Sequence, residues 1–176
     1  MFRYVALVLI VLLNSCKSDL DHTPKEKNKI DARTETAKNI EVYYSENGKK
    51  AAKLFAPTMM RQEDSLNRTY FPNGIHLDMY DSLETPSSVM TSKYAELDHS
   101  TNFMKAKDSV VVISTNGQSL KSNELIWKQN ERKLETNGAV ELRTKNEIIY
   151  GDSLFADENL RRYVIKKVRG IVQVKK

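Results

Sequence analysis

The most constraining feature of the sequence is a repeated unit of about thirty residues, a period typical of stacked β units. Residues 110–151 hold one complete copy, in which Val140 and Leu142 alternate with polar neighbours and Asn-Gly pairs occupy residues 116–117 and 137–138. Period two places alternate side chains on one face of a strand, and Asn-Gly suits the positive φ angles of a tight hairpin turn. The stretch therefore predicts short antiparallel strands.

The repeat becomes visible when the chain is shifted against itself. An offset of about thirty residues aligns Val140 with Val110, and one of about twenty-nine aligns Ser122 with Gly151, although any meander of short strands has some self-similarity. The match lies in the spacing of apolar residues more than in identity.

Further strands are predicted on both sides of this stretch. Residues 40–44 and 53–60 are expected to form a hairpin around an Asn-Gly pair, with Pro57 at an edge or a bulge because proline cannot donate to a ladder. Residues 69–81 read as one amphipathic strand. No window has a helical period, so an all-β meander is predicted. Its remaining strands are expected at residues 89–97, 103–107, 109–114, 119–127, 134–136, 139–144, 148–155 and 162–174.

Such a meander must bury one face of its sheet. It can close as a barrel, or fold into two layers that pack on each other or enclose something. The apolar faces consist mostly of Val, Ile, Leu and Met, with few aromatic residues. This composition suits a lining for alkyl chains and equally suits an ordinary core.

The N-terminus carries the signature of an exported lipoprotein. The apolar run at residues 4–13 is shorter than the roughly twenty residues that span a bilayer, but it fits the apolar region of a secretory signal. Leu13, Ser15 and Cys16 resemble a bacterial lipobox, from which Asn14 departs. Because Cys16 is the only cysteine, it cannot form an internal disulfide, and we interpret it as the lipid anchor. The alternative is an ordinary cleaved signal with an accidental cysteine.

Three regions follow from this interpretation. Residues 1–15 are predicted to be a lipoprotein signal peptide, and residues 16–38 a lipidated flexible tether, because the latter contain almost no large apolar residues. Residues 39–176 are then left as one domain, which is large enough for a core.

Residue types that support catalysis are dispersed. His22, His76 and His99 have no metal-ligand spacing, and no nucleophile elbow, phosphate loop or Cys-His pair is present in the sequence. His76 and Asp78 share a strand face and could tune a base, but a solvent-side polar pair is the simpler interpretation. We therefore expect no enzyme activity, no cofactor and no metal.

The formal net charge is +5, and basic residues gather towards the C-terminus. This charge suits anionic lipid head groups or a phosphorylated glycolipid, and it equally suits a solvated face that keeps sheet edges soluble. Nucleic acid is not expected as a partner, because no aromatic platform is interleaved with the basic residues.

A series of segments in fixed order carries a family resemblance. Along residues 40–174 the chain reads VYYSENGKKAAKLFAPTMM, TYFPNGIHLDMYD, SSVMTSKYAELD, GQSLKSNELIW, LETNGAVELRT, IIYGDSL and YVIKKVRGIVQV. This series resembles the LptC family, the membrane-anchored periplasmic component of the lipopolysaccharide export machine. The chain departs from the family at its anchor, since many members carry one transmembrane helix whereas this chain looks lipidated at Cys16.

The resemblance implies a twisted, antiparallel, two-layer folded-over sheet, β-jellyroll-like and of the OstA/LptA type, with an apolar groove between the layers. It also implies that an ABC transporter of the inner membrane delivers lipopolysaccharide to this groove, and that a periplasmic bridge protein of the same fold receives it. The physical need is clear, because an acyl chain of about fourteen carbons exposed to water costs roughly 10 kcal/mol. The expected location is the periplasmic face of the envelope, with the anchor in the inner membrane. The alternative is a structural or adhesive envelope lipoprotein with a closed β core.

The family motifs place Phe71 and Val172 in the groove. Strand parity adds Ile75, Leu77, Met79, Val112, Leu125, Trp127, Val140, Leu142, Val164 and Val168, although Trp127 also suits a plain core.

Open sheet edges are the expected docking sites for the two protein partners. The candidates are Val42 and Tyr44 in the first strand and Lys167, Arg169 and Val174 in the last, where Lys167 could also be an ordinary surface lysine. Gly151 and Gly170 are expected where a Cβ would obstruct a close backbone approach, or at a bulge.

Overall fold

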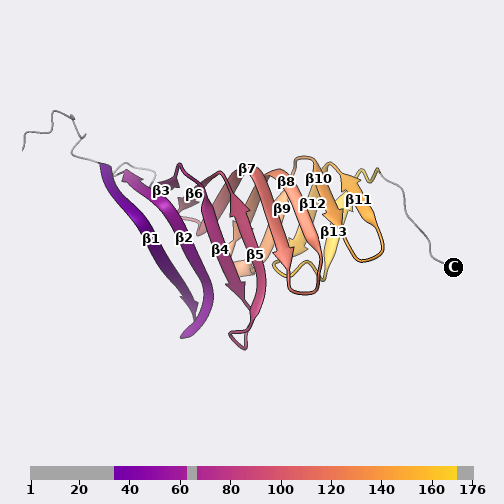
Figure 1. The fold of residues 1–176 in the computed structure, drawn as a ribbon, viewed down its shortest axis with the longest axis horizontal. Helices are drawn as coiled ribbons and strands as arrows, with labels where there is room; N and C mark the ends of the chain where they lie inside the picture. Colours follow the sequence, from indigo (N-terminus) through magenta and orange to yellow (C-terminus); the bar gives the residue numbers. More distant parts are fainter. Residues whose placement is uncertain (1–33, 63–66, 170–176) are drawn as a thin grey trace, which may run out of the picture. The chain divides into compact units, whose positions relative to one another are not determined.

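The strands of the protein form one antiparallel sheet of 13 members in a computed structural model that describes residues 34–62 and 67–169 (Figure 1). The only helical element among these residues is a single 3-10 turn, η1 (Gln129–Glu131). The predicted all-β fold is therefore confirmed. The strands are β1 (Thr34–Glu46), β2 (Lys49–Gln62), β3 (Arg68–Phe71), β4 (Ile75–Tyr80), β5 (Pro86–Ser92), β6 (Tyr94–Asp98), β7 (Phe103–Ser114), β8 (Ser119–Lys128), β9 (Lys133–Thr136), β10 (Val140–Arg143), β11 (Ile148–Gly151), β12 (Ser153–Asp157) and β13 (Tyr163–Lys166).

The first hairpin joins β1 to β2 through Asn47 and Gly48, which both have positive φ, as the Asn-Gly pair predicts. The strands are longer than expected. Residues 34–38, which were predicted to belong to the flexible tether, form the start of β1 and pair with the end of β2. The prediction was wrong there because these residues are polar, and composition does not reveal a strand that is held by backbone hydrogen bonds at a sheet edge.

Long strands fold the sheet into two layers. The first half of β7 pairs with β6 and its second half with β5, while β8 begins against β10 and ends against β9. Likewise β2 pairs with β4 up to Phe55 and with β3 from Met60. Layer one thus contains β1, β2, β4, β5, β7, β8, β10 and β11, and layer two contains β1, β2, β3, β6, β7, β8, β9, β12 and β13, since the long strands take part in both. This arrangement confirms the predicted two-layer folded-over sheet.

The points where strands cross between the layers have irregular backbone. In β7 the crossing lies at Asp108 and Ser109, which both have positive φ and where the register with β8 shifts. In β2 the crossing includes Pro57, where the pairing with β1 is interrupted opposite Asn39, another residue with positive φ. Proline is tolerated here because no ladder hydrogen bond is required from it. At Pro57, which was expected at an edge or a bulge, the structure has an irregularity within one continuous strand.

The sequence repeat corresponds to a pair of chain segments that each pass through both layers. Val110 and Val140 are the first residues to enter layer one after a crossing, and both pair with Ser122 of β8. Ser122 and Gly151 are in turn the last paired residues of layer one before the chain crosses back. Every second crossing runs in the same direction, which explains why an offset of about thirty residues superimposes the apolar pattern.

The segment of residues 69–81 is two strands and not the single strand that was predicted. β3 lies in layer two and β4 in layer one, and the chain turns between them at Gly74, whose φ is +85°. A Cβ at Gly74 would lie 2.3 Å from the carbonyl oxygen of Ser92, so glycine is required. The buried positions keep the same odd-numbered parity on both sides of the turn, with Phe71 before it and Ile75 after it, so the pattern suggested a single strand.

Candidate functional site

The space between the two layers is lined by apolar side chains from both. Leu77 and Met79 of β4 face inward from layer one, and Phe71 and Leu125 face inward from layer two, each with at most 1% of its surface exposed. These side chains fill the interior, and thioethers lie among the aliphatic groups. The largest fully buried side chains are Trp127, Phe71, Leu54, Leu77, Met79, Met90, Met104, Leu120, Leu125, Leu134, Leu142 and Leu154.

Most residues that were predicted to line a groove lie in this interior. Those on β3, β4, β7, β8 and β10 are at most 5% exposed, and their contact with a lipid stays a prediction. They are Phe71, Ile75, Leu77, Met79, Val112, Leu125, Trp127, Val140 and Leu142.

Val164 and Val168 do not face the interior, so the parity prediction for them is wrong. Val164 is 59% exposed and Val168 is 57% exposed, whereas Tyr163 and Ile165 are the residues of β13 that pack against the core. Lys167, whose φ is +51°, interrupts the alternation that was counted along residues 162–174, and this accounts for Val164, which precedes it. Val172 lies outside the described residues.

The predicted docking residues on β1 are half-buried. Val42 and Tyr44 both pack against the core, and the Tyr44 ring meets Trp127 edge-on, with centroids 5.9 Å apart and planes at 87°. Burial raises the pKa of Tyr44 to about 12. Among the described strands β1 pairs only with β2, so its other edge is open.

The predicted docking residues near the C-terminus lie on the surface. Lys167 is exposed, and Arg169 forms a β-bridge with Tyr150 of β11, in which each backbone N–H donates to the other residue's carbonyl at 3.0 and 2.7 Å. The chain therefore pairs with β12 through β13 and then, at Arg169, with β11. Val174 and Gly170 lie outside the described residues.

On the side opposite the crossings, two rims of loops bound the interior, and we call the line between them the mouth. The layer-one rim consists of residues 47–48, 81–85, 115–118 and 144–147, and the layer-two rim of residues 99–102, 129–132 and 158–162. The rims touch near the middle of the sheet. There Ser88 Oγ donates to the carbonyl of Glu158 at 2.7 Å, and Ser114 Oγ donates to the carbonyl of Asn159 at 2.8 Å.

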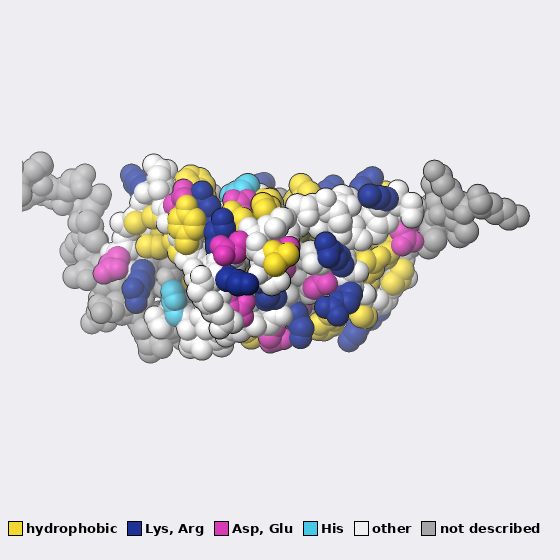
Figure 2. All heavy atoms as spheres, turned by 90° about the horizontal axis from the view of Figure 1, so that it is seen from below, with side chains coloured by type: hydrophobic (Ala, Val, Ile, Leu, Met, Phe, Trp, Pro, Cys, Tyr) yellow, Lys and Arg dark blue, Asp and Glu magenta, His cyan; other side chains and the backbone are white. Residues whose placement is uncertain are grey.

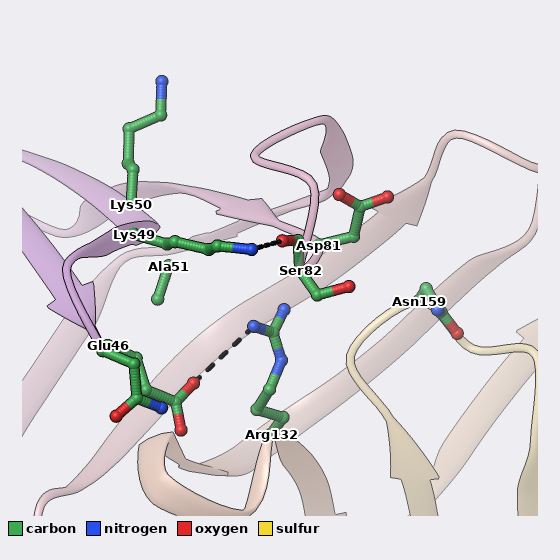
Figure 3. A pocket seen from close by; sticks show the side chains of 9 residues that line it. Glu46, Lys49, Lys50, Ala51, Asp81, Ser82, Arg132 and Asn159 are labelled. Carbon is green, nitrogen blue, oxygen red and sulfur yellow. Dashed lines mark hydrogen bonds and ion pairs between the residues drawn. The ribbon is translucent and has the colours of Figure 1, made fainter.

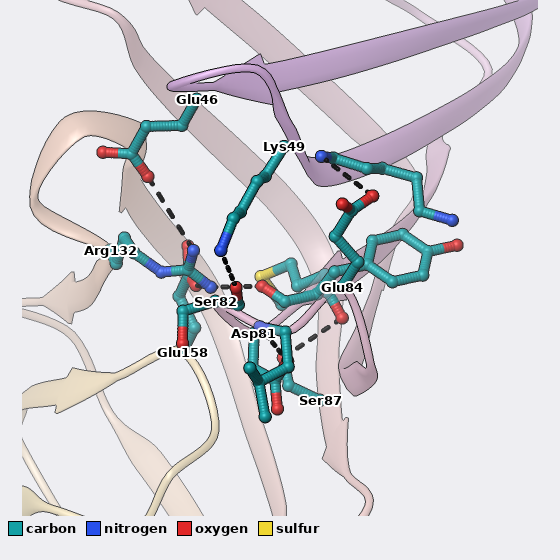
Figure 4. Close-up of polar contacts among 12 residues, drawn as sticks. Glu46, Lys49, Asp81, Ser82, Glu84, Ser87, Arg132 and Glu158 are labelled. Carbon is teal, nitrogen blue, oxygen red and sulfur yellow. Dashed lines mark hydrogen bonds and ion pairs between the residues drawn. The ribbon is translucent and has the colours of Figure 1, made fainter.

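Arg132 strengthens this contact. Its guanidinium donates to the carbonyl of Tyr80 in layer one and lies 2.9 Å from Oε2 of Glu158. A longer ion pair of 3.8 Å joins it to Glu46 at the end of β1, and Figure 4 shows the Arg132 side chain between these two carboxylates. We call Arg132, Glu158 and Asn159, with the layer-one groups Tyr80, Ser88 and Ser114 that they reach, the clasp.

Glu158 also connects the clasp to the interior. Its Oε1 accepts a hydrogen bond from Nε1 of Trp127 at 2.6 Å, and only 5% of the residue is exposed. Burial raises the pKa of Glu158, while the hydrogen bond from Trp127 and the charge of Arg132 act in the opposite direction. This group was not predicted, because its members come from separate loops. The one available signal was that the indole N–H of a buried tryptophan needs an acceptor.

Two cavities flank the clasp at the mouth. One has a volume of about 420 Å³ and is lined by charged side chains of both rims, among them Lys49 and Arg132, which extend into it in Figure 3. Lys49 Nζ donates across this space to the carbonyl of Ser82 at 3.0 Å. The other cavity, of about 350 Å³, is lined by Glu158 and Arg162. Arg132 borders both cavities.

The outer faces of the sheet carry many charged side chains, with exposed hydrophobic side chains such as Phe55 and Ile113 among them. Figure 2 shows a face on which Lys and Arg side chains are interspersed with Asp and Glu. His76 and Asp78 form the expected pair, with Nε2 and Oδ1 3.0 Å apart and half of the His76 side chain exposed. Among residues 34–62 and 67–169, no group of His, Cys, Asp and Glu could hold a metal ion.

His99 should make the stability of the fold sensitive to pH. Its Nε2 lies 2.8 Å from Thr69 Oγ1, and burial together with the charge of Arg61 lowers the pKa of the ring below 6.5. A base whose pKa is lowered by folding contributes stability above its unfolded pKa, and this contribution is lost as the pH falls. We expect a loss of less than about 1 kcal/mol between pH 7.5 and 5.5, since solvent screens this exposed ring.

Urea denaturation of the protein and of His99→Gln at several pH values measures this effect. The difference in unfolding free energy between the two proteins should shift in favour of the variant at low pH. A difference that is constant over this range would contradict the prediction. His76→Gln, on the solvent-exposed pair, is the matched control.

A two-layer antiparallel sheet whose strands cross between the layers around an apolar interior defines a β-jellyroll-like protein. The chain belongs to the LptC family, since the family model described as "Lipopolysaccharide-assembly, LptC-related" matches residues 3–173. Membership associates the chain with lipopolysaccharide transport in the cell envelope. A search of curated proteins gives no match. In the part of the chain that the structure describes, no helix is long and apolar enough to cross a membrane.

Proposed function

We propose that this protein is a membrane-anchored periplasmic lipopolysaccharide-transfer protein. It receives lipopolysaccharide from an ABC transporter and passes the acyl chains along its interior to a bridge protein of the same fold. The observation that carries this proposal is the apolar interior, which continues across the strands of both layers from β2 to β12. Membership of the LptC family supports it.

The residues of the interior suit transient occupation by alkyl chains. Met79, Met90 and Met104 are fully buried there, and methionine adapts its shape because its side chain is unbranched and rotates freely. Side chains fill the space between the layers, so a chain can enter only where the layers separate and the methionines repack. The protein then binds its cargo without chemical turnover.

The N-terminal lipid anchor would keep this interior close to the transporter. In this proposal residues 1–15 are removed as a signal peptide, Cys16 carries the lipid in the inner membrane, and the residues up to the start of β1 form the tether. The open edge of β1 and the last strand are the two docking edges, one towards the transporter and the other towards the bridge protein, both by β-augmentation.

Site-specific photo-crosslinking in cells tests the proposal. A photoreactive amino acid at Phe71, which faces the interior, should capture lipopolysaccharide, and the yield should fall when the transporter is deprived of ATP. The matched control is Asp78, which points outward on β4, the next strand along the chain. Adducts from Asp78 but not from Phe71 would refute lipid transfer through the interior.

A second candidate is a structural or adhesive envelope lipoprotein with a closed β core, and the filled interior favours it. In that case no interior position captures lipopolysaccharide. Depletion of the protein would also leave lipopolysaccharide export intact, whereas loss of a transfer protein should make lipopolysaccharide accumulate in the inner membrane.

A further inference from the structure

Only one side of the interior is free to open. On the crossing side β2, β7 and β8 run without interruption from one layer to the other, so separation there would break the chain or its ladders. On the opposite side the layers end in loops. Any widening of the interior must therefore occur at the mouth, by rotation of the layers about the crossings.

Side chains hold the rims together. In the described residues, Ser88, Ser114 and Arg132 each use a side-chain donor to reach a carbonyl of the other layer, and Asn116 Nδ2 adds a bond of 3.3 Å to the carbonyl of Asn159. Such single contacts can break one at a time, unlike a β-ladder, whose bonds form and break cooperatively.

The ion pair at the centre of the clasp suits a closure that has to open. Glu158 is almost fully buried while the Arg132 side chain is 31% exposed, so closing the mouth removes the carboxylate from water. The desolvation of such a pair offsets much of its Coulomb attraction. The pair therefore specifies the closed arrangement and adds little to its net stability.

Trp127 contacts both the clasp and the interior, so displacement of its ring by a lipid would change the hydrogen bonds of the clasp. Its ring is buried among the apolar side chains and against Tyr44, and its Nε1 supplies one of the hydrogen bonds to Glu158. An alkyl chain that displaces the indole removes this donor, and the carboxylate then gains by returning to water.

We propose that the clasp is a releasable closure of the mouth, and that the layers separate at Arg132 and Glu158 to admit or release the acyl chains of the lipid. The proposal rests on the function proposed above and adds the control of access to the same interior. Occupation of the interior and opening of the mouth then become two parts of one event.

A reversible covalent staple across the rims tests the closure. Cysteines at Ser114 and Asn159 join positions that already touch, and the single native Cys16 is occupied by lipid if the anchor forms. The oxidised pair should reduce capture of lipopolysaccharide at Phe71 by about tenfold, and reduction should restore it, because a locked rim abolishes local opening. A control staple at Lys107 and Glu124, which are paired on neighbouring strands near a crossing, should leave capture unchanged.

The outcomes separate the two proposals. Full capture at Phe71 with the Ser114–Asn159 pair oxidised would overturn the clasp as a closure and leave lipid transfer standing. Absence of capture in the unstapled protein would overturn lipid transfer, and the closure with it.

A second measurement needs no lipid. Arg132→Gln leaves the buried carboxylate of Glu158 without its cationic partner, and it should increase maleimide labelling of a cysteine at the fully buried Leu160 by about fivefold or more, through more frequent opening. Lys121→Gln is the control, since Lys121 pairs with Glu141 away from the mouth. Equal labelling rates for the two variants would overturn the proposal.

Discussion

Replacing Trp127 by alanine should lower the free energy of unfolding by about 3 to 5 kcal/mol, the usual loss for a large buried aromatic side chain. The side chain is 2% exposed, so the substitution leaves a cavity between the layers. It also removes the edge-on contact with Tyr44 and one hydrogen bond to the carboxylate of Glu158. Urea denaturation of the purified protein, followed by circular dichroism, measures the loss.

Trp127→Phe separates the two causes. Phenylalanine keeps most of the ring but has no N–H, so among residues 34–62 and 67–169 Glu158 retains Arg132 alone as a side-chain partner. We expect a loss of about 1 to 2 kcal/mol, because a buried acceptor loses a hydrogen bond. A cost below about 1 kcal/mol for the alanine variant would contradict the filled interior, since removal of the ring would then create no new cavity.

The architecture was largely predictable because its signals are local. Asn-Gly pairs mark turns such as the one at Asn47 and Gly48, and period two identifies the strands. The offset of about thirty residues aligns Val110 with Val140, and at both residues the chain has just crossed into layer one. These signals survive because each rests on backbone conformation or on the burial of one strand face.

The crossings themselves were harder to predict because several do not interrupt the alternation of side chains. Phe71 and Ile75 are both buried although they belong to different layers, so a single strand explained the pattern equally well. Near the C-terminus the opposite occurred. The irregular backbone at Lys167 could not be predicted, because the residue there is neither glycine nor proline. Val164 was therefore expected to face the interior, whereas it faces solvent.

The clasp depends on tertiary structure alone. Arg132 follows a 3-10 turn and Glu158 follows β12, and neither position has a periodic neighbour that predicts its partner. Only the fold places the two loops on the same rim. The function of the apolar interior is likewise not encoded in single residues, because the same Leu, Val and Met side chains would fill an ordinary core.

Gly151 is the residue whose replacement should most strongly affect the C-terminal edge of the sheet. A Cβ at this position would lie 2.2 Å from Cγ2 of Ile165 and 2.8 Å from the carbonyl oxygen of Lys166. That carbonyl also accepts a hydrogen bond from the backbone N–H of Asp152, so it cannot move without loosening the ladder between β12 and β13. The close approach expected from the sequence is therefore confirmed.

Gly151→Ala should cost about 2 to 3 kcal/mol, as is typical of overpacking at a constrained site. The loss should be concentrated in the last strand, whose amides should exchange faster with solvent deuterium. Gly138→Ala is the matched control, because its Cβ would meet only Thr136 Oγ1 at an ordinary 3.5 Å. Equal stability of the two alanine variants would show that the last strand does not pack as closely on Gly151 as the structure describes.

A second-site change shows which contact is responsible. Ile165→Ala removes the methyl group that a Cβ at Gly151 would strike, but the clash with the Lys166 carbonyl remains. The double variant should therefore recover only part of the lost stability, which a double-mutant cycle measures as a coupling free energy. If the last strand docks the bridge protein, Gly151→Ala should also weaken that complex, whereas Gly138→Ala should leave it intact. Because Phe71 lies on β3, near the other end of the strand order from β12 and β13, capture of lipid at Phe71 should persist while its onward transfer fails.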